Sequence, residues 1–171
     1  FVQPAQKASI NVQFLKIMEQ KDAACAYCGA QGHATRYCAA KAIANGAIGR
    51  WVIPDVGVNV ACYASSAQSV CDLKDSACYF SFGAQYAIAD HWNQGFDAIK
   101  KCAVGTKAYM ETNDGKQWYT CTEVIPNGHN TGSILTDADN NSIENNNVGG
   151  IVCYTCNSNW KDITIVFFAP M

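Results

Sequence analysis

Apolar residues recur along the first part of the chain at the spacing of a helix. Ile10, Phe14, Ile17 and Met18 fall on one face with polar residues between them, which predicts a helix over residues 5–24. Similar spacing, and one alanine-rich stretch, predict two more helices. The apolar stripe of the last helix consists of Ile88, Trp92, Phe96 and Ile99. The three predicted helices span residues 5–24, 33–44 and 85–102.

Strands are predicted where apolar residues alternate with polar or small ones. Val58, Val60 and Cys62 alternate with Asn59 and Ala61, the two-residue period of a half-buried strand. Later in the chain, an Asn-Asp-Gly turn joins two such segments into a hairpin. The predicted strands occupy residues 56–62, 77–82, 106–112, 116–124, 151–155 and 162–168.

This order of elements predicts an α+β fold, in which an antiparallel β-sheet packs against about three helices. A chain of 171 residues is long enough for one domain with a substantial core. A weak domain boundary near 126–132 is a second interpretation. The expected parts are an N-terminal helical hairpin (5–46), an α/β body (50–125), a long polar loop (126–148) and a C-terminal hairpin (149–169).

The cysteine content adds disulfides to this picture. An even number of cysteines is typical of a small secreted scaffold, so the fold is expected to be stapled by disulfides and the protein to be extracellular. The glycosylation sequon at Asn140 agrees with secretion, and no apolar run is long enough to span a membrane. The sequence leaves the pairing open. The ten cysteines are Cys25, Cys28, Cys38, Cys62, Cys71, Cys78, Cys102, Cys121, Cys153 and Cys156.

Four residues in the first cluster permit a different chemistry. Cys25, Cys28, His33 and Cys38 have the spacing C-x2-C-x4-H-x4-C, which resembles a CCHC zinc knuckle. A knuckle holds tetrahedral zinc through three thiolates and one imidazole. The resemblance implies binding of single-stranded nucleic acid, and the basic excess of the first fifty residues is compatible with that. Under the disulfide interpretation the same cysteines bind no metal.

Catalytic arrangements are not evident in the sequence. Cys153 and Cys156 form a second C-x2-C pair, but they lie in a predicted strand, which is not where redox-active pairs are found. The chain has three histidines, His33, His91 and His129, and no Gly-x-Ser-x-Gly motif. Because His91 lies on a predicted helix, we expect it to cap or pack there. The protein is therefore not expected to be an enzyme.

The cysteine order over residues 60–124 is similar to that of secreted fungal killer toxins and related plant-pathogen effectors. A strand ends at Cys62, Cys71 and Cys78 follow, and a helix closing at Cys102 leads into a hairpin. The resemblance implies a disulfide-stapled α/β sandwich with a role in virulence. We expect a secreted, monomeric effector or toxin that binds a protein or cell-surface target of a host or competitor. The alternatives are a zinc-dependent nucleic-acid-binding protein and a small secreted hydrolase.

Overall fold

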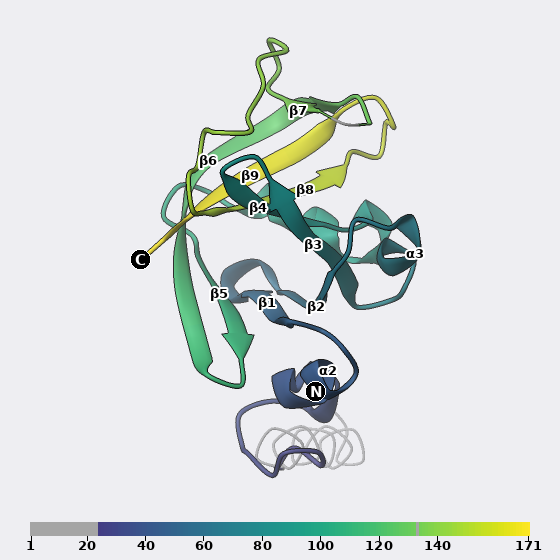
Figure 1. The fold of residues 1–171 in the computed structure, drawn as a ribbon, viewed down its shortest axis with the longest axis vertical. Helices are drawn as coiled ribbons and strands as arrows, with labels where there is room; N and C mark the ends of the chain where they lie inside the picture. The colour runs from purple at the N-terminus through teal and green to yellow at the C-terminus, as the bar shows by residue number, and fades with distance from the viewer. Residues whose placement is uncertain (1–23, 133) are drawn as a thin grey trace, which may run out of the picture.

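The computed structural model describes residues 24–132 and 134–171, and its main feature is a β-sheet that closes on itself (Figure 1). The strands follow the order β5-β1-β2-β3-β4-β8-β9-β6, and β6 pairs again with β5, so that eight strands form a barrel; β7 is attached only to β6. The strands are β1 (Gly49–Ile53), β2 (Val58–Ala64), β3 (Ser76–Phe82), β4 (Gln85–Ala89), β5 (Lys107–Thr112), β6 (Gly115–Asn130), β7 (Leu135–Thr136), β8 (Ile151–Cys156) and β9 (Ile163–Pro170).

Strand β6 closes the barrel because it is long enough to pair with two neighbours. Its first residues pair with β5, up to Thr120 opposite Lys107, and the rest pairs with β9 as far as Gly128 opposite Ile163. Two irregularities in the β6–β9 register bend the strand along its length. Most pairs in the barrel are antiparallel, but β2–β3 and β4–β8 are parallel.

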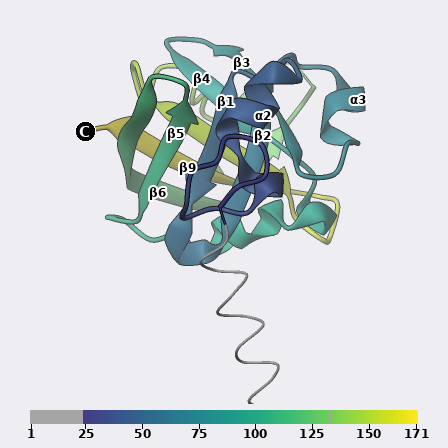
Figure 2. The same cartoon turned by 90° about the horizontal axis from the view of Figure 1, so that it is seen from below.

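The helices are short and lie outside the barrel. In Figure 1, α2 lies below β1 and β2, and in Figure 2 it lies in front of them, so it covers this end of the barrel. Ala42 of α2 packs there with Ala61 of β2. The helices are α2 (Ala39–Ala44) and α3 (Gln68–Cys71), and the 3-10 turns are η1 (Thr35–Tyr37), η2 (Pro54–Val56), η3 (Trp92–Gln94) and η4 (Phe96–Lys101).

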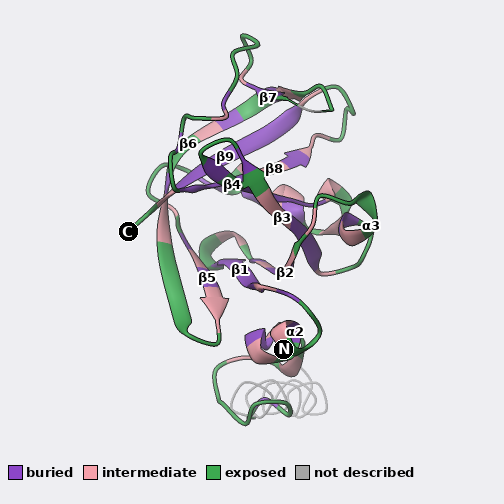
Figure 3. Cartoon of the chain, in the orientation of Figure 1, coloured by how far each residue is buried: buried purple, intermediate pink, exposed green. Residues whose placement is uncertain are grey.

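Two apolar clusters occupy the two faces of the sheet, and both use β9. Phe168 belongs to the barrel interior together with Trp51, whose ring centroid lies 5.3 Å from that of Phe168. Phe167 belongs to the second cluster, which packs on the outer face and includes Leu135 and Ile143. Figure 3 shows β9 buried along most of its length, whereas the tip of the β5–β6 hairpin is exposed. A strand buried on both faces shows no alternation of polar and apolar residues.

The fold is mainly β, so the predicted α+β class is wrong. The predicted helix over 85–102 is instead β4 followed by η3 and η4. Gly95, at a φ of 95°, stands between the two turns and interrupts any continuous helix. Part of the apolar stripe still marks buried positions. Phe96 and Ile99 are three residues apart, and both are buried in η4.

Other local predictions had mixed outcomes. The hairpin over 106–124 forms, as do the strands predicted over 77–82, 151–155 and 162–168. The predicted polar loop over 126–148 is wrong at its start, because β6 runs on to Asn130 and is followed by β7. The second predicted helix is reduced to η1 and α2, and the first lies outside the described residues except at residue 24. Single-domain organisation stays a prediction.

The expected disulfides are absent. All ten cysteines lie in the described part of the chain, and each is free. Four of them, Cys62, Cys102, Cys121 and Cys153, are packed in the barrel interior, where thiols act as small apolar groups. Burial raises the pKa of the Cys62 and Cys102 thiols to about 12. The count of cysteines therefore did not predict their bonding correctly. The extracellular location stays a prediction.

Within residues 24–132 and 134–171, every helix is too short or too polar to cross a lipid bilayer.

Candidate functional site

His91 and Cys156 stand at matching positions where two paired parallel strands end. Strand β4 pairs in parallel with β8, with Ala89 opposite Tyr154. Cys156, the last residue of β8, and His91 each lie two residues beyond that pair. Continuing the register places them opposite each other, because parallel strands advance together at the same rise per residue. His91 also keeps an extended backbone, with φ −68° and ψ 140°.

Both side chains belong to the outer face of the sheet. Side chains two residues apart on a strand share a face, so Cys156 lies on the same face as Tyr154. Tyr154 packs on the outer face against the cluster that contains Phe80, and Cys156 packs there too. Cys156 is only partly buried. It is thus a thiol within reach of solvent, at the register position opposite His91.

The imidazole of His91 is held by residues of α3 and of its C-terminal end. Its Nε2 lies 2.8 Å from Oδ1 of Asp72 and 2.8 Å from Nε2 of Gln68, which belongs to α3. Nε2 of Gln68 also donates to Oδ1 of Asp72 at 3.3 Å, and the hydrogen bonds from His91 and Gln68 hold the pKa of the Asp72 carboxyl below its ordinary value. Nε2 faces both an acceptor, Asp72, and a donor, the Gln68 amide; because an ionised Asp72 can only accept, we assign the proton to Nε2, and the Gln68 amide then donates to Asp72 rather than to the ring. Nδ1 then keeps the lone pair and is the atom that can act as a base.

The chain after Cys156 is fixed by a hydrogen-bonded turn. The backbone N–H of Asn157 donates to the carbonyl of Asp162 at 2.9 Å, and its side-chain amide donates to the carbonyl of Pro126 at 2.9 Å. The hydroxyl of Thr164 on β9 donates to Oδ1 of Asn157 at 2.7 Å. Cys156 is therefore held at the end of a rigid strand rather than on a free loop.

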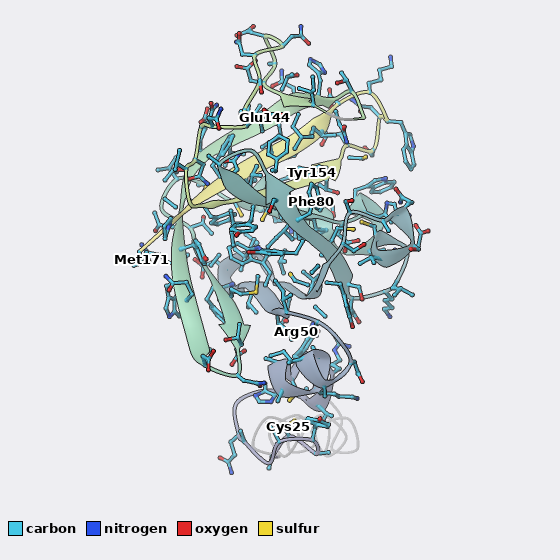
Figure 4. The ribbon with its side chains drawn as sticks, in the orientation of Figure 1. Cys25, Arg50, Phe80, Glu144, Tyr154 and Met171 are labelled. Carbon is cyan, nitrogen blue, oxygen red and sulfur yellow. The ribbon has the colours of Figure 1, made fainter. Side chains whose placement is uncertain are left out.

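A pocket with both apolar and polar walls lies on the same outer face. It has a volume of about 220 Å³, and its walls include Phe80, Tyr154, Ile134 and Leu135. Phe80 and Tyr154 lie side by side on β3 and β8 in Figure 4. Because Tyr154 is two residues before Cys156 on the same face, the pocket can hold an apolar group of a molecule whose polar part reaches the thiol.

Asp90 stands between the last residue of β4 and His91 and is 4 % exposed. Its Oδ1 accepts a hydrogen bond from the backbone N–H of His91 at 2.7 Å, whereas its Oδ2 is buried without a partner. Burial raises the pKa of the Asp90 carboxyl to about 7. The carboxylate form is therefore the unfavourable one at this position.

Replacing Asp90 by asparagine should flatten the pH dependence of stability. In the unfolded chain an aspartate loses its proton near pH 4. With a folded pKa of about 7, the folded state holds the extra proton between these values, so stability falls as the pH rises from about 4 to 7. Asp90→Asn keeps the acceptor for the His91 N–H and removes the charge. Urea unfolding at pH 4, 5.5, 7 and 8 measures the effect.

Asp114→Asn, at an exposed position in the β5–β6 turn, is the matched control for this experiment. The Asp90 variant is expected to gain stability over the wild type at pH 8 and to differ little at pH 4. An equal gain at both pH values would contradict a raised pKa at Asp90.

The structure also brings together the four residues of the predicted metal motif. The Sγ atoms of Cys25, Cys28 and Cys38 and a ring nitrogen of His33 all lie within 4.8 Å of one another. Backbone N–H groups of Cys28 and Tyr27 donate to the Cys25 sulfur and lower the pKa of that thiol to about 6, although burial opposes this. In Figure 4 the labelled Cys25 lies at the end of the molecule occupied by α2.

The second C-x2-C pair is split by the sheet. Cys153 and Cys156 are three residues apart on β8, so their side chains point to opposite faces. Cys153 is in the barrel interior and Cys156 is on the outer face. This excludes a shared site for the two thiols. Elsewhere, Cys71 and Cys78 form a buried pair with their Sγ atoms 3.0 Å apart, between α3 and β3.

Sequence reasoning named Cys156 and His91 but did not connect them. His91 was assigned to a helix, and so it was expected to cap or pack. The usable signal was the Gln85–Ala89 segment, whose strand ends immediately before Asp90 and His91. A histidine and a cysteine that each follow a predicted strand are candidates for one site, because strand ends gather at one edge of a sheet.

Comparison with known proteins gives structural matches only. No protein-family model matches the chain, and no curated protein matches it. A sortase E1 from Streptomyces coelicolor, solved with a tripeptide in its active site, matches with a TM-score of 0.60 and 18 % identity over 73 % of this chain and 88 % of that one. A sortase D5 transpeptidase from Clostridium perfringens matches with a TM-score of 0.57 and 21 % identity over 73 % and 79 %.

A third match is the complex of Streptococcus agalactiae sortase C1 with MTSET, which has a TM-score of 0.55 and 16 % identity over 74 % of this chain and 68 % of that one. These findings overturn the expected resemblance of residues 60–124 to fungal toxins and plant-pathogen effectors. They equally overturn the zinc-knuckle nucleic-acid-binding alternative, and they contradict a non-enzymatic protein, since the matching structures are of enzymes. The chain has the β-barrel fold of the sortases.

Proposed function

We propose that the protein is a cysteine-dependent transpeptidase, with Cys156 as the nucleophile and His91 as the general acid and base. The observation that carries the proposal is the continued β4–β8 register, which sets a partly exposed thiol opposite an imidazole. A nucleophile next to a base, with the base oriented by a third group, is the usual arrangement of covalent catalysis. The third group is Asp72, which holds Nε2 of His91.

The reaction would proceed in two balanced steps. In the first, His91 takes the proton of the Cys156 thiol, and the sulfur attacks the carbonyl carbon of a peptide bond. The C–N bond breaks, the departing amine takes the proton from His91, and a thioester remains on Cys156. In the second step an amine attacks the thioester, its proton passes through His91 to the sulfur, and a new amide forms as the C–S bond breaks.

The substrates would be proteins or peptides. The Streptomyces sortase E1 holds a tripeptide in its active site, and the Clostridium enzyme is described as a transpeptidase. The pocket beside Tyr154 would accept an apolar side chain of the acyl donor, upstream of the bond that reaches Cys156. Phe80 and Leu135 supply its apolar walls.

The reactivity of Cys156 toward iodoacetamide tests the pairing with His91. We expect Cys156 to be alkylated at neutral pH, and we expect His91→Ala to slow this alkylation by about tenfold or more, because the thiolate is the reactive form. Peptide mapping by mass spectrometry distinguishes Cys156 from Cys28, the one other cysteine of the chain that is not buried.

His129→Ala is the matched control, since His129 is a histidine on β6 that does not belong to the proposed pair. It should leave the alkylation rate of Cys156 unchanged. If the rates of the two histidine variants are the same, His91 does not activate the thiol and the proposed dyad is refuted.

A further inference from the structure

We propose that Cys25, Cys28, His33 and Cys38 bind one zinc ion that organises residues 24–38, the segment outside the barrel that precedes α2. The proposal is independent of the transpeptidase site, because it involves other residues at another place in the fold. It concerns a structural ion: four protein ligands fill a tetrahedral shell and leave no position for a substrate.

The spacing of the ligand atoms fits a tetrahedral ion. With Zn–S near 2.3 Å and Zn–N near 2.0 Å, a sulfur and a nitrogen of one tetrahedron stand roughly 3.5 Å apart. The Sγ of Cys28 and the Nε2 of His33 are 3.4 Å apart, and no pair in the group exceeds 4.8 Å. Three thiolates and one imidazole are soft and borderline ligands, which favour zinc over calcium or magnesium.

The backbone around the group is shaped to present these ligands. Gly29 and Gly32 take φ values of 73° and 96°, which glycine adopts without strain, and they turn the chain between the second ligand and the third. The N–H of Gly29 donates to the carbonyl of Cys25 at 2.8 Å and closes the first turn. Donors around a thiolate ligand stabilise its charge, and two backbone N–H groups point at the sulfur of Cys25.

The side chain of Thr35 supports the first ligand, Cys25. The hydroxyl of Thr35 interacts with the Cys25 sulfur, and its oxygen accepts a hydrogen bond from the backbone N–H of Ala26 at 2.9 Å. Thr35 thereby links its own part of the segment to Cys25 and Ala26, near the segment's other end. Metal sites in proteins commonly have such partners, which hold the ligands in place.

Among the residues that the structure describes, apolar packing alone does not account for the burial of Cys25 and Cys38. Cys25 and Cys38 are only 3 % and 2 % exposed, yet neither belongs to any apolar cluster of the described residues. Residues 24–38 contain one 3-10 turn, η1, and no residue of that turn is buried. Within the described part of the chain these two buried thiols have neither a disulfide nor an apolar cluster, and a metal ion would explain this arrangement.

The same segment is anchored to the barrel. The guanidinium of Arg50 on β1 lies 5.5 Å from the ring centroid of Tyr37, and Arg50 is itself held by Oδ1 of Asn59 at 2.6 Å. Figure 4 shows Arg50 between the barrel and the part of the chain that contains Cys25. His33 also lines a groove of about 740 Å³ whose other wall includes Tyr109 of β5. The ion would therefore fix one wall of that groove.

Metal content and cobalt spectroscopy test the proposal. The purified full chain should contain about one equivalent of zinc, and the wild type loaded with Co²⁺ should show the absorption of a tetrahedral thiolate site. His33→Ala should lose most of the zinc, whereas His33→Cys, which gives a four-thiolate site, should retain about one equivalent. His129→Ala is the matched control and should retain it as well.

The Co²⁺ spectrum of the wild type does not depend on any variant folding, so it decides the case if His33→Ala is insoluble. An intact mass that shows an oxidised pair among Cys25, Cys28 and Cys38, with no zinc, would overturn the proposal. So would a His33→Ala variant that keeps a full equivalent of zinc. Neither result would bear on Cys156 or His91.

Discussion

Replacing Cys156 by alanine should abolish acyl transfer while leaving the fold intact. The alanine side chain cannot form a thioester, so the loss should be about 10³-fold or more, as for other enzymes that lose their nucleophile. The thiol is only partly buried, which makes its removal a small change to the core. The assay incubates the protein with a mixed peptide pool and hydroxylamine, and mass spectrometry detects the peptide hydroxamates that a thioester intermediate would yield.

Ser158→Ala is the matched control, because Ser158 is exposed and lies two residues after Cys156. It should retain wild-type activity. A covalent acyl adduct on Cys156 should be visible in the intact mass of the wild type and missing in the Cys156→Ala variant. Hydroxamate formation that survives Cys156→Ala would show that another group is the nucleophile.

Local periodicity predicted the parts of the fold that depend on neighbouring residues. The β5–β6 hairpin follows from the turn at Asn113, Asp114 and Gly115, because such a turn fixes the register of the strands beside it. Strand β1 was not predicted, since all five of its residues are buried and it shows no alternation. Closure of the barrel was also beyond prediction: it requires β6 to pair with both β5 and β9.

The site depends on long-range pairing in the same way. Nothing within ten residues of His91 indicates that β4 pairs in parallel with β8, and Cys156 is 65 positions further along the chain. Two parallel strands need a long connection between them, and here that connection contains β5, β6 and β7. The metal group is the opposite case. Its four residues lie within fourteen positions, so their spacing alone was enough to identify them.

The cysteine count misled because it pooled thiols with different roles. Cys62 and Cys121 fill the barrel interior, Cys25 and Cys38 stand beside His33, and Cys156 is the last residue of a strand, on the outer face of the barrel. Composition cannot separate these roles, since each is set by the burial and the neighbours of the sulfur atom. The even number that favoured disulfides is therefore a coincidence of several unrelated environments.

Replacing Phe168 by alanine should lower the free energy of unfolding by about 3–5 kcal/mol, as for other fully buried aromatic residues. Phe168 is 0 % exposed, and its ring meets Trp51 edge-to-face at a centroid distance of 5.3 Å. Trp51 meets Tyr119 in the same way at 5.4 Å, so the change would remove a partner from the centre of an aromatic cluster. Urea unfolding followed by tryptophan fluorescence measures the loss.

Val104→Ala is the control for this prediction, because Val104 is 74 % exposed and its truncation should change stability by less than about 0.5 kcal/mol. If Phe168→Ala does not fold, Phe168→Leu keeps most of the apolar volume and should give a smaller, measurable loss. A loss below about 1 kcal/mol for the alanine variant would contradict a barrel interior centred on Phe168 and Trp51.

Because β9 also pairs with β8, which ends at Cys156, a weakened interior should reduce acyl transfer on heating before the protein unfolds.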